Sequence, residues 1–294
     1  MLKTDEINIR DPFIMVYEGK YYLYGTRSKT CWEKADGFDC YISTDLNEWE
    51  GPIEVFHKPD DFFATEKYWA PECYFYHGAF YLFCTFASEQ EKSCMYLLKS
   101  EKPEGPFAVY SEQVTPKGWA CIDGTFYEQD GEPYLIFSRT FEDVREGQYW
   151  ITRLSPDLKK AVGEPQLIFT GKDALWSRPI PFIKEVLGRY EEAYLTDGPC
   201  AVKLPDGTLG ITWSSFGEKG YSVGLVLSKS GRIEGPWEHV DQVIYEEDGG
   251  HGMFFKSLDG TQYFVMHSPD EHFKEKPCFK KVKMAGHTIQ FLRE

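Results

Sequence analysis

The sequence predicts an all-β fold: a five-bladed β-propeller in which each blade is a four-stranded antiparallel sheet. A unit that opens with a short polar motif and runs through β-rich sequence to a Gly-centred turn recurs five times, which indicates one supersecondary unit copied around an axis. Aromatic residues are abundant, with 22 Phe, 19 Tyr and 8 Trp, as packed twisted sheets require. Short alternating runs bounded by Gly, Pro, Asn and Asp dominate, and no window shows a sustained helical period.

The five units follow one another along the whole chain. The first opens with Arg-Asp-Pro-Phe at residues 10–13, the second with Trp-Ala-Pro-Glu at 69–72 and the third with Ile-Asp-Gly at 122–124. The fourth opens with Thr-Asp-Gly-Pro at 196–199 and the fifth with Gly-His-Gly at 250–252. We therefore expect residues 1–294 to form a single catalytic propeller domain, since closed all-β architectures reach this length.

Four long irregular stretches interrupt the predicted strands. They span Thr30–Phe38, His57–Lys67, Arg139–Gly147 and Thr170–Glu192. Long loops in a compact domain are usually functional. We expect these four to form the rim of the propeller and to shape any binding site there.

Charge and cysteine content exclude several classes of function. The net charge of −15 argues against nucleic acid and anionic membranes as partners, because both attract clustered Lys and Arg, and it allows a neutral ligand such as a sugar. The eight cysteines lack metal-binding spacing, so we expect reduced thiols rather than structural zinc. We find no apolar signal segment or membrane span and expect a cytoplasmic protein, with an exported form as the alternative. The oligomeric state is left open.

Three aspartates carry the predicted chemistry. Asp11, Asp123 and Asp197 each stand at the start of an innermost strand, where the strands of a propeller converge on its channel. We expect them to occupy matching positions in their blades and to meet at one centre, where mutual repulsion and lost solvation raise at least one pKa. An ionised carboxylate beside a protonated one is what cleavage of a glycosidic bond requires. The alternative for each single Asp is a structural role, since Asp-Gly and Asp-Pro are common turn dipeptides.

The order of the five motifs resembles glycoside hydrolase family 43, the five-bladed propellers that include arabinofuranosidases, β-xylosidases and arabinanases. The similarity covers essentially the whole chain. It implies an inverting hydrolase of α-L-arabinofuranosides or β-D-xylosides in short plant-type oligosaccharides. Asp11 would be the general base that activates a water, Asp123 would orient the acid and tune its pKa, and Asp197 would take the place of the general acid.

One position departs from the pattern of this family. The family usually has Glu where this chain has Asp197, and the shorter side chain reaches about 1.5 Å less. Proton transfer needs heavy atoms about 2.6–3.2 Å apart, so the change could abolish or redirect activity. Glu191 and Glu192, just upstream, are alternative acids. We favour Asp197 because its place in the repeat matches that of the other two aspartates.

Five further residues are candidates for the site, each with a structural alternative. His251 would lie near an axial metal or water, as in relatives, or serve as a buried structural residue. If a metal binds, calcium is the expected ion, and the chemistry requires no other cofactor. Trp69 and Trp119 could stack on a sugar face or pack between blades. Arg178 could grip sugar hydroxyls or form a surface ion pair, and Glu72 could bind substrate hydroxyls or cap a neighbouring blade.

Three other functions fit parts of the sequence. A carbohydrate-binding propeller that has lost catalysis would explain the Asp at the acid position. An invertase-like retaining glycosidase also has Arg-Asp-Pro and Glu-Cys motifs, found here at 10–12 and 72–73, but it places a nucleophile motif before them that this sequence lacks. A WD-type scaffold would carry Trp-Asp dipeptides, which do not occur in the sequence. We therefore expect a hydrolase with an oligosaccharide substrate.

Overall fold

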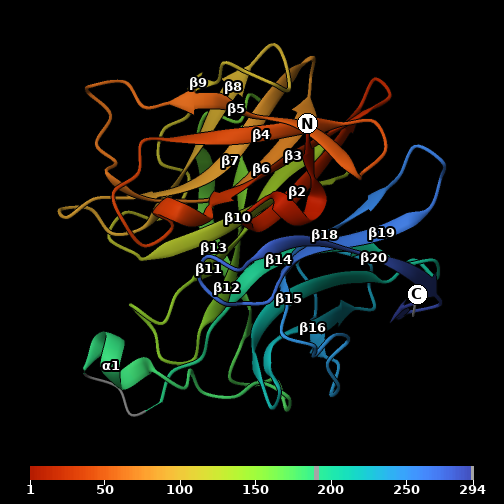
Figure 1. The fold of residues 1–294 in the computed structure, drawn as a ribbon. Coiled ribbons are helices and arrows are strands. Elements are labelled where there is room, and N and C mark those ends of the chain that lie inside the picture. The colour runs from red at the N-terminus through yellow and green to blue at the C-terminus, as the bar shows by residue number, and fades with distance from the viewer. Residues whose placement is uncertain (189–191, 293–294) are drawn as a thin grey trace.

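Five antiparallel sheets make up the computed structural model of this chain, which describes residues 1–188 and 192–292 (Figure 1). Each sheet comes from a contiguous segment and forms one blade. From the inside outwards, the first blade contains β2 (Ile9–Tyr17), β3 (Lys20–Arg27), β4 (Gly37–Ser43) and β5 (Glu48–His57), with β1 (Leu2–Lys3) on its outer edge. The second blade contains β6 (Glu66–Tyr76), β7 (Ala79–Ala87), β8 (Cys94–Ser100) and β9 (Ala108–Val109).

The remaining three blades follow the same order from the inside outwards. The third contains β10 (Cys121–Gln129), β11 (Glu132–Arg139), β12 (Gln148–Leu154) and β13 (Ala161–Thr170). The fourth contains β14 (Asp197–Lys203), β15 (Leu209–Gly217), β16 (Gly220–Ser228) and β17 (Glu238–His239). The fifth contains β18 (Gly250–Lys256), β19 (Gln262–Ser268), β20 (Lys276–Ala285) and β21 (Thr288–Phe291). The short helical elements are α1 (Ile183–Leu187) and the 3-10 turns η1 (Thr4–Glu6) and η2 (Ser28–Thr30).

The innermost strands close into a ring. Strand β2 contacts β6, β6 contacts β10, β10 contacts β14, β14 contacts β18, and β18 returns to β2. Backbone and side-chain hydrogen bonds join the fifth blade to the first: the Ile9 N–H donates to the carbonyl of Glu275 at 3.3 Å, and the Asn8 amide donates to that of Phe273 at 2.8 Å. The predicted five-bladed β-propeller is confirmed.

The Gly-centred turns of the sequence close the first hairpin of three blades. Two-residue loops join β2 to β3, β6 to β7 and β10 to β11, and both loop residues have positive φ in each case. Such turns match the twist of the flanking strands and favour Gly at their second position. The Glu18-Gly19 and Asp130-Gly131 pairs therefore fix the register of the strands that carry Asp11 and Asp123.

Aromatic packing between blades holds the ring together, as the composition predicts. Between the first two blades, Phe38, Phe56 and Phe86 lie with ring centroids 5.8–6.3 Å apart. Seven of the eight cysteines are buried thiols. In the described ranges, no helical segment combines the length and the apolar character that a bilayer span requires.

Candidate active site

Each innermost strand carries the same irregularity near its start. The pairing with the second strand of the blade skips two residues after the positions Arg10, Trp69, Ile122, Asp197 and Gly250. The first skipped residue has a φ between 44° and 55° in every blade; these residues are Asp11, Ala70, Asp123, Gly198 and His251. A bulge of this kind re-aims side chains and is frequent beside active sites. The five bulges therefore set the side chains at the mouth of the channel.

The prediction that all three aspartates take matching positions is wrong for Asp197. Asp11 and Asp123 are the first bulge residues of their blades, whereas Gly198 takes that place in the fourth blade. Asp197 pairs with Ser214 in the way that Arg10 pairs with Thr26 in the first blade. The carboxylate of Asp197 therefore approaches the centre from the residue before the bulge.

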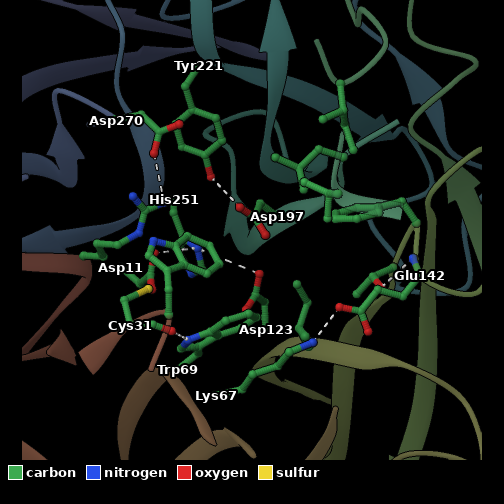
Figure 2. Close-up of a pocket in the computed structure, with 18 of the residues that line it drawn as sticks. Asp11, Cys31, Lys67, Trp69, Asp123, Glu142, Asp197, Tyr221, His251 and Asp270 are labelled. Carbon is green, nitrogen blue, oxygen red and sulfur yellow. Dashed lines mark hydrogen bonds and ion pairs between the residues drawn. The ribbon is translucent and has the colours of Figure 1, made fainter. Parts of the chain in front are cut away.

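The three aspartates nevertheless meet in one cavity. Asp11, Asp123, Asp197 and His251 line a cavity of about 670 Å³, and Figure 2 shows their side chains converging within it. All four loops predicted to form the rim contribute to its walls. The residues that they and their flanking strand ends supply are Cys31, Trp32, Glu33, Glu66, Lys67, Thr140, Phe141, Glu142, Ile180, Phe182 and Val186.

The walls of the cavity differ in character. On the side of the fourth-blade loop, Phe141 and Phe216 pack against a buried apolar cluster around Ile180. On the side of the second and third blades, Nζ of Lys67 pairs with Oε1 of Glu142 at 2.5 Å (Figure 2). The aspartates thus lie between an apolar wall and an ion pair that joins two blades.

Asp11 is buried and kept in its ionised form. Thr26 Oγ1 donates a hydrogen bond to Oδ2 of Asp11 at 2.5 Å, and Nδ1 of His251 lies 3.1 Å from Oδ1. Burial alone would raise the pKa of Asp11, but the neighbouring His251 and the Arg10 guanidinium lower it below its ordinary value. An ionised carboxylate of this kind can accept a proton from water.

The pKa of Asp123 is shifted in the opposite direction. Burial, the adjacent carboxylate of Asp197 and the more distant charge of Asp11 raise the pKa of Asp123 well above its ordinary value. The N–H of Gly198 donates to Oδ2 of Asp123 at 3.1 Å, and the N–H of Asp123 itself donates to Thr85 Oγ1 at 3.0 Å. Asp123 therefore holds a proton to a higher pH than an ordinary aspartate does.

Asp197 is the least buried of the three aspartates. The hydroxyl of Tyr221 donates to Oδ2 of Asp197 at 2.8 Å, and the hydroxyl of Tyr149 donates to its backbone carbonyl at 2.9 Å. Both tyrosines are fully buried. Asp197 is therefore fixed at its main chain and its side chain while its carboxylate lines the cavity.

A charged network that the sequence did not reveal lies behind Asp11. The buried guanidinium of Arg10 pairs with Asp270 and with Glu275, each at 2.8 Å. Ser28 Oγ donates to the second oxygen of Glu275 at 2.8 Å. Arg10, Asp270 and Tyr221 line the cavity. Both partners of Arg10 come from the fifth blade, whereas Tyr221 binds Asp197 within the fourth blade. The Arg that directly precedes Asp11 in the first motif was the one sequence signal that pointed to this network.

The two predicted tryptophans lie in different surroundings. Trp69 lines the cavity, donates from Nε1 to the carbonyl of Cys31 at 2.7 Å and meets the Trp32 ring edge-on, with centroids 5.3 Å apart. Trp119 packs against Trp150 at 4.8 Å, and the described cavity lining does not include it. The sugar-stacking role therefore suits Trp69, and Trp119 takes the alternative role of packing.

The remaining candidates lie away from the aspartates. Arg178 pairs with the exposed Glu218 at 2.8 Å, which is the surface ion pair given as its alternative. Glu72 accepts a hydrogen bond from the Tyr74 hydroxyl at 2.6 Å, and burial raises its pKa to about 8. Neither belongs to the described lining of the cavity. Glu192 is exposed and its carbonyl accepts a hydrogen bond from Arg145, while Glu191 lies outside the described residues.

The one cluster of metal-ligand types at the centre consists of Asp123, Asp197 and His251, among the residues that the structure describes. Their donor atoms lie within 4.8 Å of one another. Calcium takes six to eight oxygen ligands, and this set offers two carboxylates and one nitrogen, with Nδ1 of His251 already 3.1 Å from Asp11. The described residues therefore do not fit a calcium ion held by the protein alone.

Comparisons with known proteins agree with this geometry. The family model described as glycosyl hydrolases family 43 matches residues 6–288. A xylosidase/arabinosidase 43A of Humicola insolens is 26% identical over 276 residues, which cover 90% of this chain and 73% of that protein. This match decides against the scaffold, binding-module and invertase-like alternatives.

Solved structures of similar proteins cover almost the whole chain. An endo-arabinase from Bacteroides thetaiotaomicron is 32% identical, with a TM-score of 0.88 and 97% of both chains covered. An endo-1,4-β-xylanase from the same organism is 26% identical, with a TM-score of 0.71, and the match covers 97% of this chain and 94% of that one. The chain therefore belongs to glycosyl hydrolase family 43 and is an inverting O-glycosyl hydrolase.

Proposed function

We propose that this enzyme hydrolyses α-L-arabinofuranosides or β-D-xylosides in short oligosaccharides, with Asp11 as the base and Asp197 as the acid. The observation that carries the proposal is the meeting of three aspartates in one cavity, with the pKa of Asp11 lowered and that of Asp123, beside Asp197, raised. The sugar class rests on similarity to the endo-arabinase and to the xylosidase/arabinosidase. The buried thiols fit a reducing compartment, so we place the reaction in the cytoplasm.

The base side of the reaction uses Asp11. Its lowered pKa keeps the carboxylate ionised near neutral pH. A water between this carboxylate and the anomeric carbon gives its proton to Asp11 as its oxygen bonds to the carbon. Thr26 donates to Oδ2 of Asp11, and Nδ1 of His251 lies 3.1 Å from Oδ1. Both contacts hold the carboxylate in place, and a remaining lone pair takes the proton.

The acid side uses Asp197 together with Asp123. Burial and the adjacent carboxylate of Asp197 raise the pKa of Asp123, which favours a proton on Asp123 beside Asp197. Asp197, the less buried of the two, passes a proton to the leaving oxygen, and Asp123 replaces it. The short reach of Asp197 is offset by its place one residue ahead of the bulge and by the Tyr221 hydroxyl that orients it.

Hydrolysis of a panel of chromogenic glycosides tests the proposal. The panel contains α-L-arabinofuranosyl, β-D-xylosyl and β-D-galactosyl compounds, and the wild type runs beside Asp11→Asn. Asp130→Asn is the matched control, because it removes an exposed carboxylate from the hairpin loop at the far end of β10. We expect turnover of the arabinosyl or xylosyl compound that Asp11→Asn abolishes and Asp130→Asn retains. Turnover of the galactoside alone, or full activity in Asp11→Asn, would contradict the proposal.

A further inference from the structure

The backbone N–H groups at the five bulges find partners in the neighbouring blade. The N–H of Ala70 donates to Thr26 Oγ1 at 2.8 Å, and that of Asp123 donates to Thr85 Oγ1 at 3.0 Å. The N–H of His251 donates to Ser214 Oγ at 2.8 Å. In each case the acceptor is a hydroxyl on the second strand of the preceding blade, at the position that faces the residue before the bulge. Three of the five bulges are thus anchored to the preceding blade by a hydroxyl, while the N–H of Gly198 donates to Asp123.

The fifth blade breaks this rule at the strand that anchors Asp11. At the position occupied by Thr26, Thr85, Ser138 and Ser214 in the other blades, β19 carries His267, which pairs with Gly250. The N–H of Asp11 donates to Nδ1 of His267 at 3.2 Å. The base is therefore the bulge residue whose main chain is held by an imidazole.

The hydrogen bonds of His267 define its tautomer. Because Nδ1 accepts from Asp11, the ring proton sits on Nε2, which faces Oδ1 of Asp270 at 3.3 Å. Asp270 in turn pairs with Arg10, the residue before Asp11. The His267 ring is fully buried and stacks on Tyr221, with centroids 5.4 Å apart and planes 17° apart. Both nitrogens and one face of the imidazole therefore have a defined partner.

We propose that His267 is a positioning residue for the reaction, which holds the main chain of Asp11 so that its carboxylate meets the attacking water. A serine or threonine would supply the acceptor but could not also reach Asp270 and support Tyr221. The imidazole does all three, and so couples the base to the Arg10–Asp270 pair. His267 acts through Asp11, because it lies outside the described lining of the cavity. Its role rests on the proposed function of Asp11 as the base.

Two substitutions separate the contacts of His267. In His267→Asn the side-chain oxygen can take the place of Nδ1, so the acceptor for Asp11 is kept and the contact with Asp270 is lost. In His267→Gln the longer amide can take the place of Nε2, so the contact with Asp270 is kept and the acceptor for Asp11 is lost. Met266→Ala, a buried neighbour on β19, serves as a control for simple loss of packing.

Steady-state kinetics with an aryl glycoside of activated leaving group distinguish the variants, since acid assistance then matters little. We expect His267→Gln to lower kcat about 50-fold with KM within twofold, because a small misplacement of a reacting group has effects of this size. His267→Asn should stay within about fivefold of the wild type. Equal losses in the two variants, a larger loss in the Asn variant, or a loss in Met266→Ala as large as in His267→Gln would overturn the proposal.

A spectroscopic readout is independent of turnover. Long-range ¹H–¹⁵N correlation of the histidine rings should show His267 as the neutral Nε2–H tautomer at pH 7. The Nδ1–H tautomer or an imidazolium would overturn the assigned role even in an active enzyme. Absence of hydrolysis by the wild type would count against the proposed function, while the tautomer would still decide how His267 holds Asp11.

Discussion

The third and fourth blades both begin with the dipeptide Asp-Gly, and they use it in different ways. In the third blade Asp123 takes the positive-φ bulge position and Gly124 follows it. In the fourth blade Gly198 takes the bulge position, and Asp197 precedes it. Asp123 is consequently buried with a raised pKa, whereas Asp197 is partly exposed and bound by Tyr221.

The difference shows how one repeated unit produces two chemical roles. When the aspartate lies one residue earlier along a bulged strand, its side chain projects from a different backbone position, although the fold of the blade is the same. The N–H of Gly198, freed for a new acceptor, donates to Asp123 instead of to a hydroxyl. The fourth blade therefore has no carboxylate at its bulge position. Its bulge N–H binds the carboxyl group of Asp123 from the third blade instead.

The largest predicted effect comes from replacing the carboxyl group of either bulge aspartate, Asp11 or Asp123. Asp11→Asn and Asp123→Asn should each lower kcat/KM about 10³-fold, because the first removes the base and the second removes the proton that Asp123 holds. Asp123→Asn should leave thermal stability unchanged or higher, because it removes a buried carboxyl group whose pKa is raised. Asp11→Asn should lower it, because it removes an ionised carboxylate that His251 and Arg10 stabilise. Steady-state kinetics and thermal melts measure the two effects. Wild-type turnover in either variant would remove that aspartate from the mechanism.

The next prediction contrasts Gly124 and Gly198, which follow Asp123 and Asp197 in the sequence. A Cβ at Gly198 would meet the His251 ring at 2.6 Å in a backbone with φ of +50°. A Cβ at Gly124 would meet the side-chain ends of Met95 and Leu135, at 2.6 and 2.7 Å. We expect Gly198→Ala to lower kcat about 100-fold by displacing His251 from Asp11, and Gly124→Ala to change it less than about tenfold. Equal losses of kcat in the two variants would show that the position of the glycine relative to the bulge does not matter for catalysis.

A smaller effect is expected from Glu72, a second buried carboxyl group, whose pKa burial raises to about 8. An acid whose folded-state pKa lies above its unfolded value costs stability as the pH rises between the two, since only the unfolded chain ionises freely. The wild type should therefore lose up to about 4 kcal/mol of unfolding free energy between pH 4.5 and pH 8 through Glu72. Glu72→Gln should melt about 5 °C higher at pH 8 and equally at pH 4. If the melting temperature changed with pH in the same way in the wild type and in Glu72→Gln, this prediction would be contradicted.

The smallest effect is expected from removal of metal. The central cluster of Asp123, Asp197 and His251 does not match the ligand number of calcium. Dialysis against a chelator should therefore change kcat/KM less than about twofold. A loss of activity that added calcium restores would show that waters complete a site around these three residues.

The sequence contained enough to predict the fold and most of the centre. The five motifs, the Gly-centred turns and the four rim loops all lie where expected, because each depends on local backbone chemistry. The register of Asp197 was misread, although Pro12, Pro71 and Pro199 share one position and place Gly198 opposite Asp11. Following the proline rather than the aspartate would have given the correct register.

The supporting residues were harder to predict because their contacts join different blades or different strands of one blade. Glu275 lies 265 positions from Arg10, and Tyr221 reaches Asp197 from another strand of its blade. His267 replaces the hydroxyl residue that the other four blades have at this position. The replacement can be recognised only when the second strands of the blades are aligned, and the structure supplies that alignment. Trp119 was chosen because it lies just before an innermost strand, and Arg178 because it lies on a long loop. In the structure Trp119 packs against Trp150, and Arg178 pairs with Glu218.

The central claim is that Asp197, one residue out of register with Asp11 and Asp123, delivers the proton to the leaving group. The most direct test measures kcat/KM for aryl glycosides whose leaving groups span a wide range of pKa, in the wild type and in Asp197→Asn. We predict a nearly flat dependence for the wild type and a steep one for the variant, with losses growing from under tenfold for the best leaving group to about 10³-fold for the poorest. Parallel lines for the two enzymes would show that another group supplies the proton.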